Sequence, residues 1–157
     1  MKKKLLIFLI ILVIFFSIYK GYLNNENMKP EDFKNTEPVI KIEKYFEGEI
    51  EAWGILQDRK GKVTRQFKAN MSGKFENNIL TLEEDFYWKD GEKQKRVWKI
   101  EKIDEHNYLG TAPDVIGKAK GASYGSAFKF EYDLMIPFKG KNIKISFDDW
   151  IFKQDDK

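Results

Sequence analysis

Two side chains of opposite charge, Glu84 and Arg96, lie in segments whose alternate residues are mainly apolar or aromatic. Alternate residues of a β-strand face the same side, so both charges are expected on an inner face beside aromatic rings. Such a pair can orient the polar head group of a ligand whose apolar part contacts the rings. For these two charges a structural ion pair in the core or at its rim is favoured over a ligand contact, because buried charges need partners whatever their use. If the inner face does bind a ligand, the candidate ligand-binding residues are Glu84, Arg96, Trp98, Phe86 and Trp53.

The sequence indicates neither a catalytic site nor a metal site. Asp148 and Asp149 are adjacent in an expected strand and would face opposite sides, so pairing with a lysine, an arginine or a backbone group is favoured over a shared metal. His106 is the only histidine and lies in the turn sequence 104–107, which excludes a site with two histidine ligands and disfavours a Ser-His-Asp triad. The chain has no cysteine, which excludes disulfides and cysteine-based sites. We expect a protein that is not an enzyme and needs no cofactor.

The elements that must position these residues are expected to be β-strands. From Val63 to Phe75 and from Leu80 to Trp88 the residues alternate with the period of two that is typical of a strand with one buried side. The turn signal Asp90-Gly91 precedes a return strand from Gln94 to Ile100. Further strands are expected over residues 108–112, 115–122, 126–138 and 142–152.

Short polar turns separate these segments, which favours sequential strands that pair in an antiparallel meander. Closure of such a meander into a barrel removes its unpaired edges. The sequence therefore predicts an all-β fold, an antiparallel up-and-down β-barrel of about eight strands. The interior of such a small barrel is either filled by side chains or holds one small ligand.

The hairpin around Asp90-Gly91 allows two registers. A three-residue loop over 90–92 pairs Glu84 with Trp98, whereas a two- or four-residue loop pairs Glu83 with Trp98. Register follows the pattern that buries the apolar face. We therefore expect the three-residue loop, which keeps the aromatic residues on one face.

The first 22 residues have the form of an export signal. Lysines at positions 2–4 precede a nearly unbroken apolar run from Leu5 to Tyr19. The residues after the run are poorly suited to cleavage, so we expect a retained signal anchor or transmembrane helix over 1–22, with residues 5–22 in contact with the membrane. A cleaved signal peptide is the alternative.

Beyond this segment we expect a polar linker over 23–40, with one helical turn at 30–34, and a β domain over 41–157. The chain has 28 lysines and arginines and 25 acidic residues, but four of the lysines lie within residues 1–22. The remaining 24 basic residues nearly balance the acidic ones. A nucleic-acid footprint requires a clustered basic surplus, so the composition predicts no nucleic-acid partner.

Several short motifs occur in one order between Ile42 and Phe152. They are Tyr45-Phe46-Glu47-Gly48, Ala52-Trp53-Gly54, Asp58-Arg59-Lys60-Gly61-Lys62-Val63, Leu82-Glu83-Glu84-Asp85-Phe86, Asp90-Gly91-Glu92, Arg96-Val97-Trp98 and Phe147-Asp148-Asp149-Trp150. In these motifs the chain resembles an uncharacterised bacterial family, named only as a domain of unknown function, DUF3833. The resemblance implies a lipocalin-like, calycin-type barrel in the cell envelope, and no activity is attached to it.

The chain departs from that family in two respects. Family members are mostly envelope lipoproteins with a lipid-modified cysteine after the apolar run, and this chain has no cysteine. The family also continues past the Asp148-Asp149-Trp150 motif into at least one more strand, whereas this sequence stops at Lys157. A protein anchor and a shortened barrel with an open seam are therefore expected.

Together these features predict a membrane-anchored module of the bacterial cell envelope. It would be held in the cytoplasmic membrane, with its C-terminal domain facing the periplasm or the exterior. The expected ligand is an apolar or amphipathic molecule such as a lipid, bound within the barrel. The alternative is a structural or interaction protein of the envelope whose filled barrel binds no ligand.

Overall fold

The computed structural model describes residues 28–138 and 140–155. The signal anchor or transmembrane helix expected over residues 1–22 lies outside the described residues. Among those that are described, no helix has both the length and the apolar character needed to cross a bilayer.

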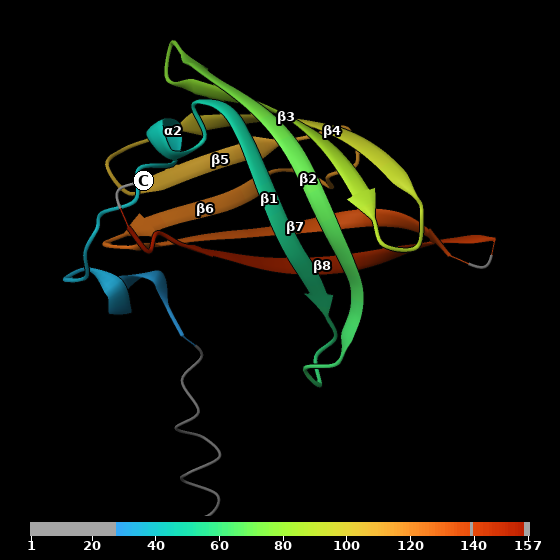
Figure 1. The fold of residues 1–157 in the computed structure, drawn as a ribbon. Coiled ribbons are helices and arrows are strands. Elements are labelled where there is room, and N and C mark those ends of the chain that lie inside the picture. Colours follow the sequence, from blue (N-terminus) through green and yellow to red (C-terminus); the bar gives the residue numbers. More distant parts are fainter. Residues whose placement is uncertain (1–27, 139, 156–157) are drawn as a thin grey trace, which may run out of the picture.

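Eight antiparallel strands form a single sheet in which each strand pairs with its neighbours in the chain (Figure 1). This confirms the all-β antiparallel meander. The strands are β1 (Gly48–Gln57), β2 (Val63–Glu76), β3 (Ile79–Trp88), β4 (Lys93–Lys102), β5 (Asn107–Thr111), β6 (Ala119–Tyr124), β7 (Ala127–Phe138) and β8 (Lys141–Phe152). A 3₁₀ turn, η1 (Pro30–Phe33), forms where one helical turn is expected.

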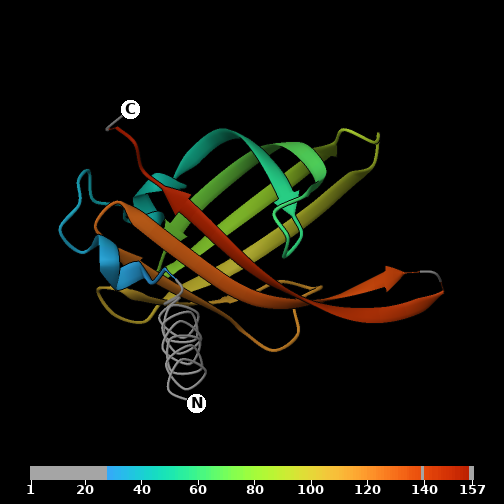
Figure 2. The same cartoon turned by 90° about the horizontal axis from the view of Figure 1, so that it is seen from below.

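The sheet curls into a half-barrel whose two edges do not pair, so the expected closed barrel is not reached. Figure 2 shows β1 to β4 arching over β5 to β8, and within the described residues no hydrogen-bonded ladder joins β1 to β8. β7 pairs with β6 only as far as Glu131; beyond it the β5–β6 loop forms one antiparallel bridge to β7, Val115 to Leu134, and the rest of β7 up to Phe138 pairs with β8 alone. A two-stranded ribbon twists more strongly than a wide sheet. The free part of the β7–β8 hairpin therefore extends away from β1 (Figure 1).

One end of the half-barrel is filled by apolar side chains and covered by residues 40–46, which we call the plug. Ile40 and Ile42 are 1% and 0% exposed and belong to the same core as Leu80, Trp98 and Phe128. The backbone of Ile40 donates to the carbonyl of residue 125 at 2.8 Å and accepts from the hydroxyl of residue 123 at 2.8 Å. The end of the expected linker is thus part of the packed structure.

The β domain expected over 41–157 includes one helical turn within the plug, where Ile42–Tyr45 forms the short helix α2. Residues four apart lie on one side of a helical turn, whereas in a strand neighbouring residues alternate between two sides. The turn lets Ile42, Glu43 and Phe46 all point into the end of the half-barrel, where all three are buried.

The β3–β4 hairpin has a three-residue loop, as expected, but the register differs by two residues. Glu84 pairs with Arg96 rather than with Trp98, and the loop is 89–91 rather than 90–92. Gly91 ends this loop with a φ of 93°. Three-residue hairpin loops favour glycine at their last, left-handed position, which fixes the register. A shift of two residues keeps every side chain on its face, so the expected inward set is unchanged.

The other expected strands agree with the structure to within two residues, except for the start of β6. The sequence predicted a strand from residue 115, but β6 begins at Ala119. Residues 112–118 instead form a loop with Gly117 at a φ of 74°. Glycine takes this left-handed conformation without steric cost, which ends the extended run before the strand starts.

Gly73 on β2 allows the plug to contact the sheet closely. A Cβ added at this position would lie 1.6 Å from the carbonyl oxygen of Phe46. We expect Gly73→Ala to lower the free energy of unfolding by about 2 kcal/mol, because the plug must move outward to make room. Urea denaturation measures this difference. The outward-facing neighbour variant Ser72→Ala is the control, expected to change stability by less than about 0.5 kcal/mol, and equal effects of both variants would contradict the assignment.

Candidate ligand-binding site

The inner face of the half-barrel changes from buried to half-buried partway along the strands. On β2, β3 and β4 the inner residues near α2 are buried, whereas those toward the opposite end are partly exposed. On β3 and β4 the change occurs at the same level, because the half-buried Glu84 pairs with the half-buried Arg96. On β2 it lies farther from α2, because Met71, the other neighbour of Glu84, is still buried. We call the half-buried part the cup. It comprises Arg65, Phe67, Glu84, Phe86, Trp88, Gln94 and Arg96, together with Asp114, Tyr132, Phe147 and Asp149.

Aromatic rings form one wall of the cup. Phe67, Phe86 and Trp88 contact one another with ring centroids 5.2 to 5.9 Å apart. At the rim the guanidinium carbon of Arg65 lies 3.8 Å from the centroid of the Trp88 ring. Two carboxylates at the β3–β4 turn hold this guanidinium by ion pairs of 2.8 Å. The wall therefore offers an apolar surface and already contacts one cation.

Arg96 is the cation at the centre of the cup. Its Nε and Nη2 atoms donate to Oδ2 of Asp114 at 3.2 and 2.7 Å, and its guanidinium carbon lies 5.9 and 5.8 Å from the ring centroids of Phe86 and Trp98. Glu84 is its cross-strand neighbour. Within the described structure, Oε2 of Glu84 and Oδ1 of Asp114 are buried without a hydrogen-bond partner. The register thus brings the expected pair together, but the hydrogen bonds of Arg96 go to Asp114.

Two acidic groups of the cup, Glu84 and Asp149, have a raised pKa and hold protons more tightly than usual. Burial raises the pKa of Glu84 to about 7, and the nearby Asp149 and Asp114 add to the rise, while attraction to Arg96 opposes it. Burial also raises the pKa of Asp149, although the hydroxyl of Tyr132 donates to its Oδ2 atom at 2.7 Å. Glu84 is therefore about half protonated near neutral pH.

A cleft reaches the cup from the seam between the two edge strands. It encloses about 920 Å³ and is lined by the end of β1, the β5–β6 loop and the facing parts of β7 and β8. Tyr132, Phe147 and Asp149 belong to its wall. This volume is at the upper end of the range typical of small-molecule sites, 300 to about 1,000 Å³.

Four of the five residues proposed from the sequence lie near one another. Glu84, Phe86 and Arg96 lie in the cup, and Trp98 is buried directly below Arg96. The structure does not bring Trp53 together with them, because its side chain is 70% exposed on the outer face of β1, near Lys68. The residues on either side of it, 52 and 54, face inward instead, which the alternation of β1 could have indicated.

The cup residues that were not proposed from the sequence include Asp114, Tyr132 and Asp149. The sequence did contain a signal for Asp149, because the alternation of residues along its strand places it on the inner face. The expected opposite facing of the two aspartates is confirmed, since Asp149 faces the cup while Asp148 lies on the outer face, 3.4 Å from the amine of Lys129. Asp114 lies in a loop, where periodicity gives no information about side-chain direction.

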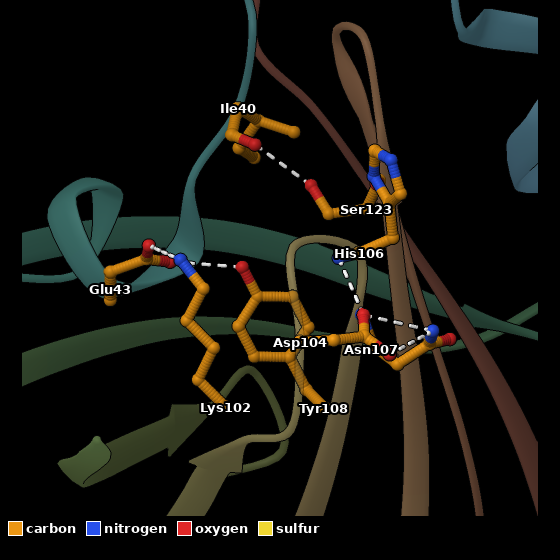
Figure 3. Close-up of polar contacts among 8 residues, drawn as sticks. All are labelled: Ile40, Glu43, Lys102, Asp104, His106, Asn107, Tyr108 and Ser123. Atoms are coloured by element: carbon orange, nitrogen blue, oxygen red, sulfur yellow. Dashed lines mark hydrogen bonds and ion pairs between the residues drawn. The ribbon is translucent and has the colours of Figure 1, made fainter.

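A second polar cluster fixes the plug rather than lining the cup. Figure 3 shows Glu43 between Lys102, with which it forms an ion pair, and Tyr108, whose hydroxyl donates to it at 2.9 Å. Burial alone would raise the pKa of Glu43, but hydrogen bonds from Lys102, from its own backbone and from Tyr108 outweigh burial and lower the pKa. The expected turn around His106 is confirmed, because Asp104 accepts its backbone N–H at 2.8 Å.

The family model described as a protein of unknown function, DUF3833, matches residues 21–157. The match covers the whole sheet and the plug. No curated protein and no solved structure matches the chain significantly.

The raised pKa of Glu84 makes stability depend on pH. A carboxyl whose pKa in the folded protein exceeds its unfolded value of 4.5 stabilises less as the pH rises through 7, because the folded state then loses a proton that it bound more tightly. Glu84→Gln removes this loss, so we expect it to be more stable than the wild type by about 2 kcal/mol at pH 8.5 and by much less at pH 5. Urea unfolding across this range measures the difference. Glu83→Gln, on the exposed face of the same strand, should show no such trend, and a pH-independent difference for Glu84→Gln would contradict the prediction.

Proposed function

The chain belongs to the DUF3833 family of proteins of unknown function, and we propose that its half-barrel binds an apolar or amphipathic small molecule, such as a lipid, in the cup. The observation that carries this proposal is that the inner face of β2, β3 and β4 is buried near α2 and half-buried toward the opposite end. Aromatic walls with a few converging polar groups are typical of small-molecule sites. The binding would be lipocalin-like, within a curled sheet closed at one end.

The unfilled state of the cup supports binding more than a structural role. Phe67, Phe86 and Trp88 remain partly exposed, although burying a large apolar side chain fully contributes roughly 2 kcal/mol. A protein with only a structural role would gain stability by filling this space. The fully packed end below Trp98 supports the second candidate, a structural or interaction protein without a ligand. The test must therefore change the half-buried cup without disturbing the packed end of the half-barrel.

We further propose that the binding domain is tethered at the cell envelope, with residues 1–22 as a retained anchor in the cytoplasmic membrane. The basic residues followed by an apolar run support this. A tethered cup near a bilayer would meet amphipathic molecules at high local concentration. We propose a binding role rather than an enzymatic one, since Arg96 and the carboxyls of the cup can serve to orient a head group.

Filling the cup tests the proposal. We expect Gln94→Trp, which places a large ring on the inner face of β4, to weaken the binding of the fluorescent apolar probe N-phenyl-1-naphthylamine to the purified full chain by about tenfold or more. Lys95→Trp places the same ring on the exposed outer face of the same strand and is expected to leave the affinity unchanged. Probe fluorescence is titrated, with any membrane mimetic that the full chain requires as the blank.

Equal affinities of the two variants, or no binding by the wild type, would reject a ligand in the cup and favour the structural role. Thermal unfolding of both variants controls for loss of the fold. A cup that is already open to solvent tolerates an added ring, so Gln94→Trp is expected to unfold within a few degrees of the wild type.

A further inference from the structure

We propose that the ligand of the cup carries a protonated amine as its polar end, so that the preferred ligand is a cationic amphiphile rather than a fatty acid. This inference rests on the proposed function and specifies the chemical class of the ligand. It follows from the charges, the unused hydrogen-bond acceptors and the aromatic surface of the cup.

The interior charges of the cup are not balanced. Among the described residues, three carboxyl groups, on Glu84, Asp114 and Asp149, interact with the single guanidinium of Arg96. With all four groups ionised, two negative charges remain. The partly buried position strengthens their field relative to that of surface charges, so the cup attracts a cation and repels an anion.

The cup offers fewer unused donors than unused acceptors to a head group. Arg96 directs both Nε and Nη2 at Asp114. Nε1 of Trp88, on the aromatic wall, is the one buried side-chain donor of the described residues that has no hydrogen-bond partner. Two acceptors, by contrast, are unused, since Oε2 of Glu84 and Oδ1 of Asp114 are buried without a hydrogen-bond partner. A buried acceptor left unpaired costs roughly 1 to 3 kcal/mol. An ammonium group donates three hydrogen bonds and accepts none, which matches what the cup lacks.

The cup already holds two cations among its aromatic rings. Arg65 lies over the Trp88 ring at 3.8 Å, and Arg96 lies about 6 Å from both Phe86 and Trp98. Aromatic faces attract cations electrostatically, most strongly where water is partly excluded. The surface that remains beside these rings therefore suits a further cation whose hydrocarbon part contacts the apolar wall.

The cleft that reaches the cup has the same sign of charge. Its lining includes three basic residues, on the β1–β2 turn, the β5–β6 loop and β6, and five acidic residues: Asp58, Glu131, Asp133, Asp148 and Asp149. A path with a negative surplus favours the approach of a cation and slows that of an anion.

Two probes with the same tail and opposite charge test this inference. Dodecylammonium and dodecanoate are titrated calorimetrically into the purified full chain at pH 8, below their micelle concentrations, and the Gln94→Trp variant supplies the non-specific background. We expect the dissociation constant of dodecylammonium to be about tenfold lower than that of dodecanoate. Glu84→Gln should reduce this preference to about threefold or less, whereas Glu83→Gln removes the same charge from the outer face and should retain it.

The outcomes separate this inference from the proposed function. Equal or tighter binding of dodecanoate by the wild type would overturn the preference for an amine but leave a ligand-binding cup. A preference that Glu84→Gln does not lower, or that Glu83→Gln lowers equally, would assign it to the general surface charge and overturn the inference. No binding of either probe above the Gln94→Trp background would reject the proposed function itself.

Discussion

The buried carboxylate of Glu43 determines which end of the half-barrel is closed. It lies on the plug, outside the sheet, yet it pairs with Lys102 on β4 and accepts a hydrogen bond from Tyr108 on β5. A buried charge whose partner is removed is strongly destabilising, so plug and sheet are held together by a contact that neither can make alone. Burial of Ile40 and Ile42 contributes apolar stabilisation to the contact between plug and sheet. The polar contacts of Glu43 determine where on the sheet the plug lies. The remaining structure follows, because a curled sheet sealed at one end exposes its inner face only at the other.

The two polar clusters inside the half-barrel have opposite electrostatic characters. At the sealed end each polar atom that fixes Glu43 has a partner, and the pKa of Glu43 is lowered. In the cup, burial raises the pKa of Glu84 and of Asp149, and acceptor oxygens are left without partners. An unpaired buried group lowers stability, and such costs are concentrated at functional sites in most proteins. The contrast therefore distinguishes a cluster that stabilises the fold from one whose buried polar atoms are only partly satisfied within the described structure.

Strand periodicity predicted which face most residues occupy, because that pattern repeats every two residues whatever the exact pairing. The inward position of Glu84 and Arg96 and the opposite facing of Asp148 and Asp149 depend on periodicity alone. The pairing partner of Glu84 depends instead on the φ of Gly91, a local backbone property.

Features set by tertiary contacts lie outside what periodicity can predict. The partner of Arg96 lies in a loop, where side-chain direction is set by the fold. The short helix of the plug forms because it brings Ile42 and Phe46 to one side, a benefit that exists only once the sheet is present. The open seam follows from the overhang of β7 and β8 past β6, which depends on strand lengths in three dimensions.

The open seam is better understood as part of the site than as a defect of the barrel. Unpaired edges invite pairing with other chains, and proteins commonly discourage this with charged side chains along the edge. The edge strand β1 carries Glu49 and Glu51, and β8 carries Lys141 and Lys144, all exposed. These charges protect both edges while the divergence of the β7–β8 ribbon keeps them apart. Closing the seam would pair the edges but would remove the cleft, which is the described route from solvent to Tyr132 and Asp149.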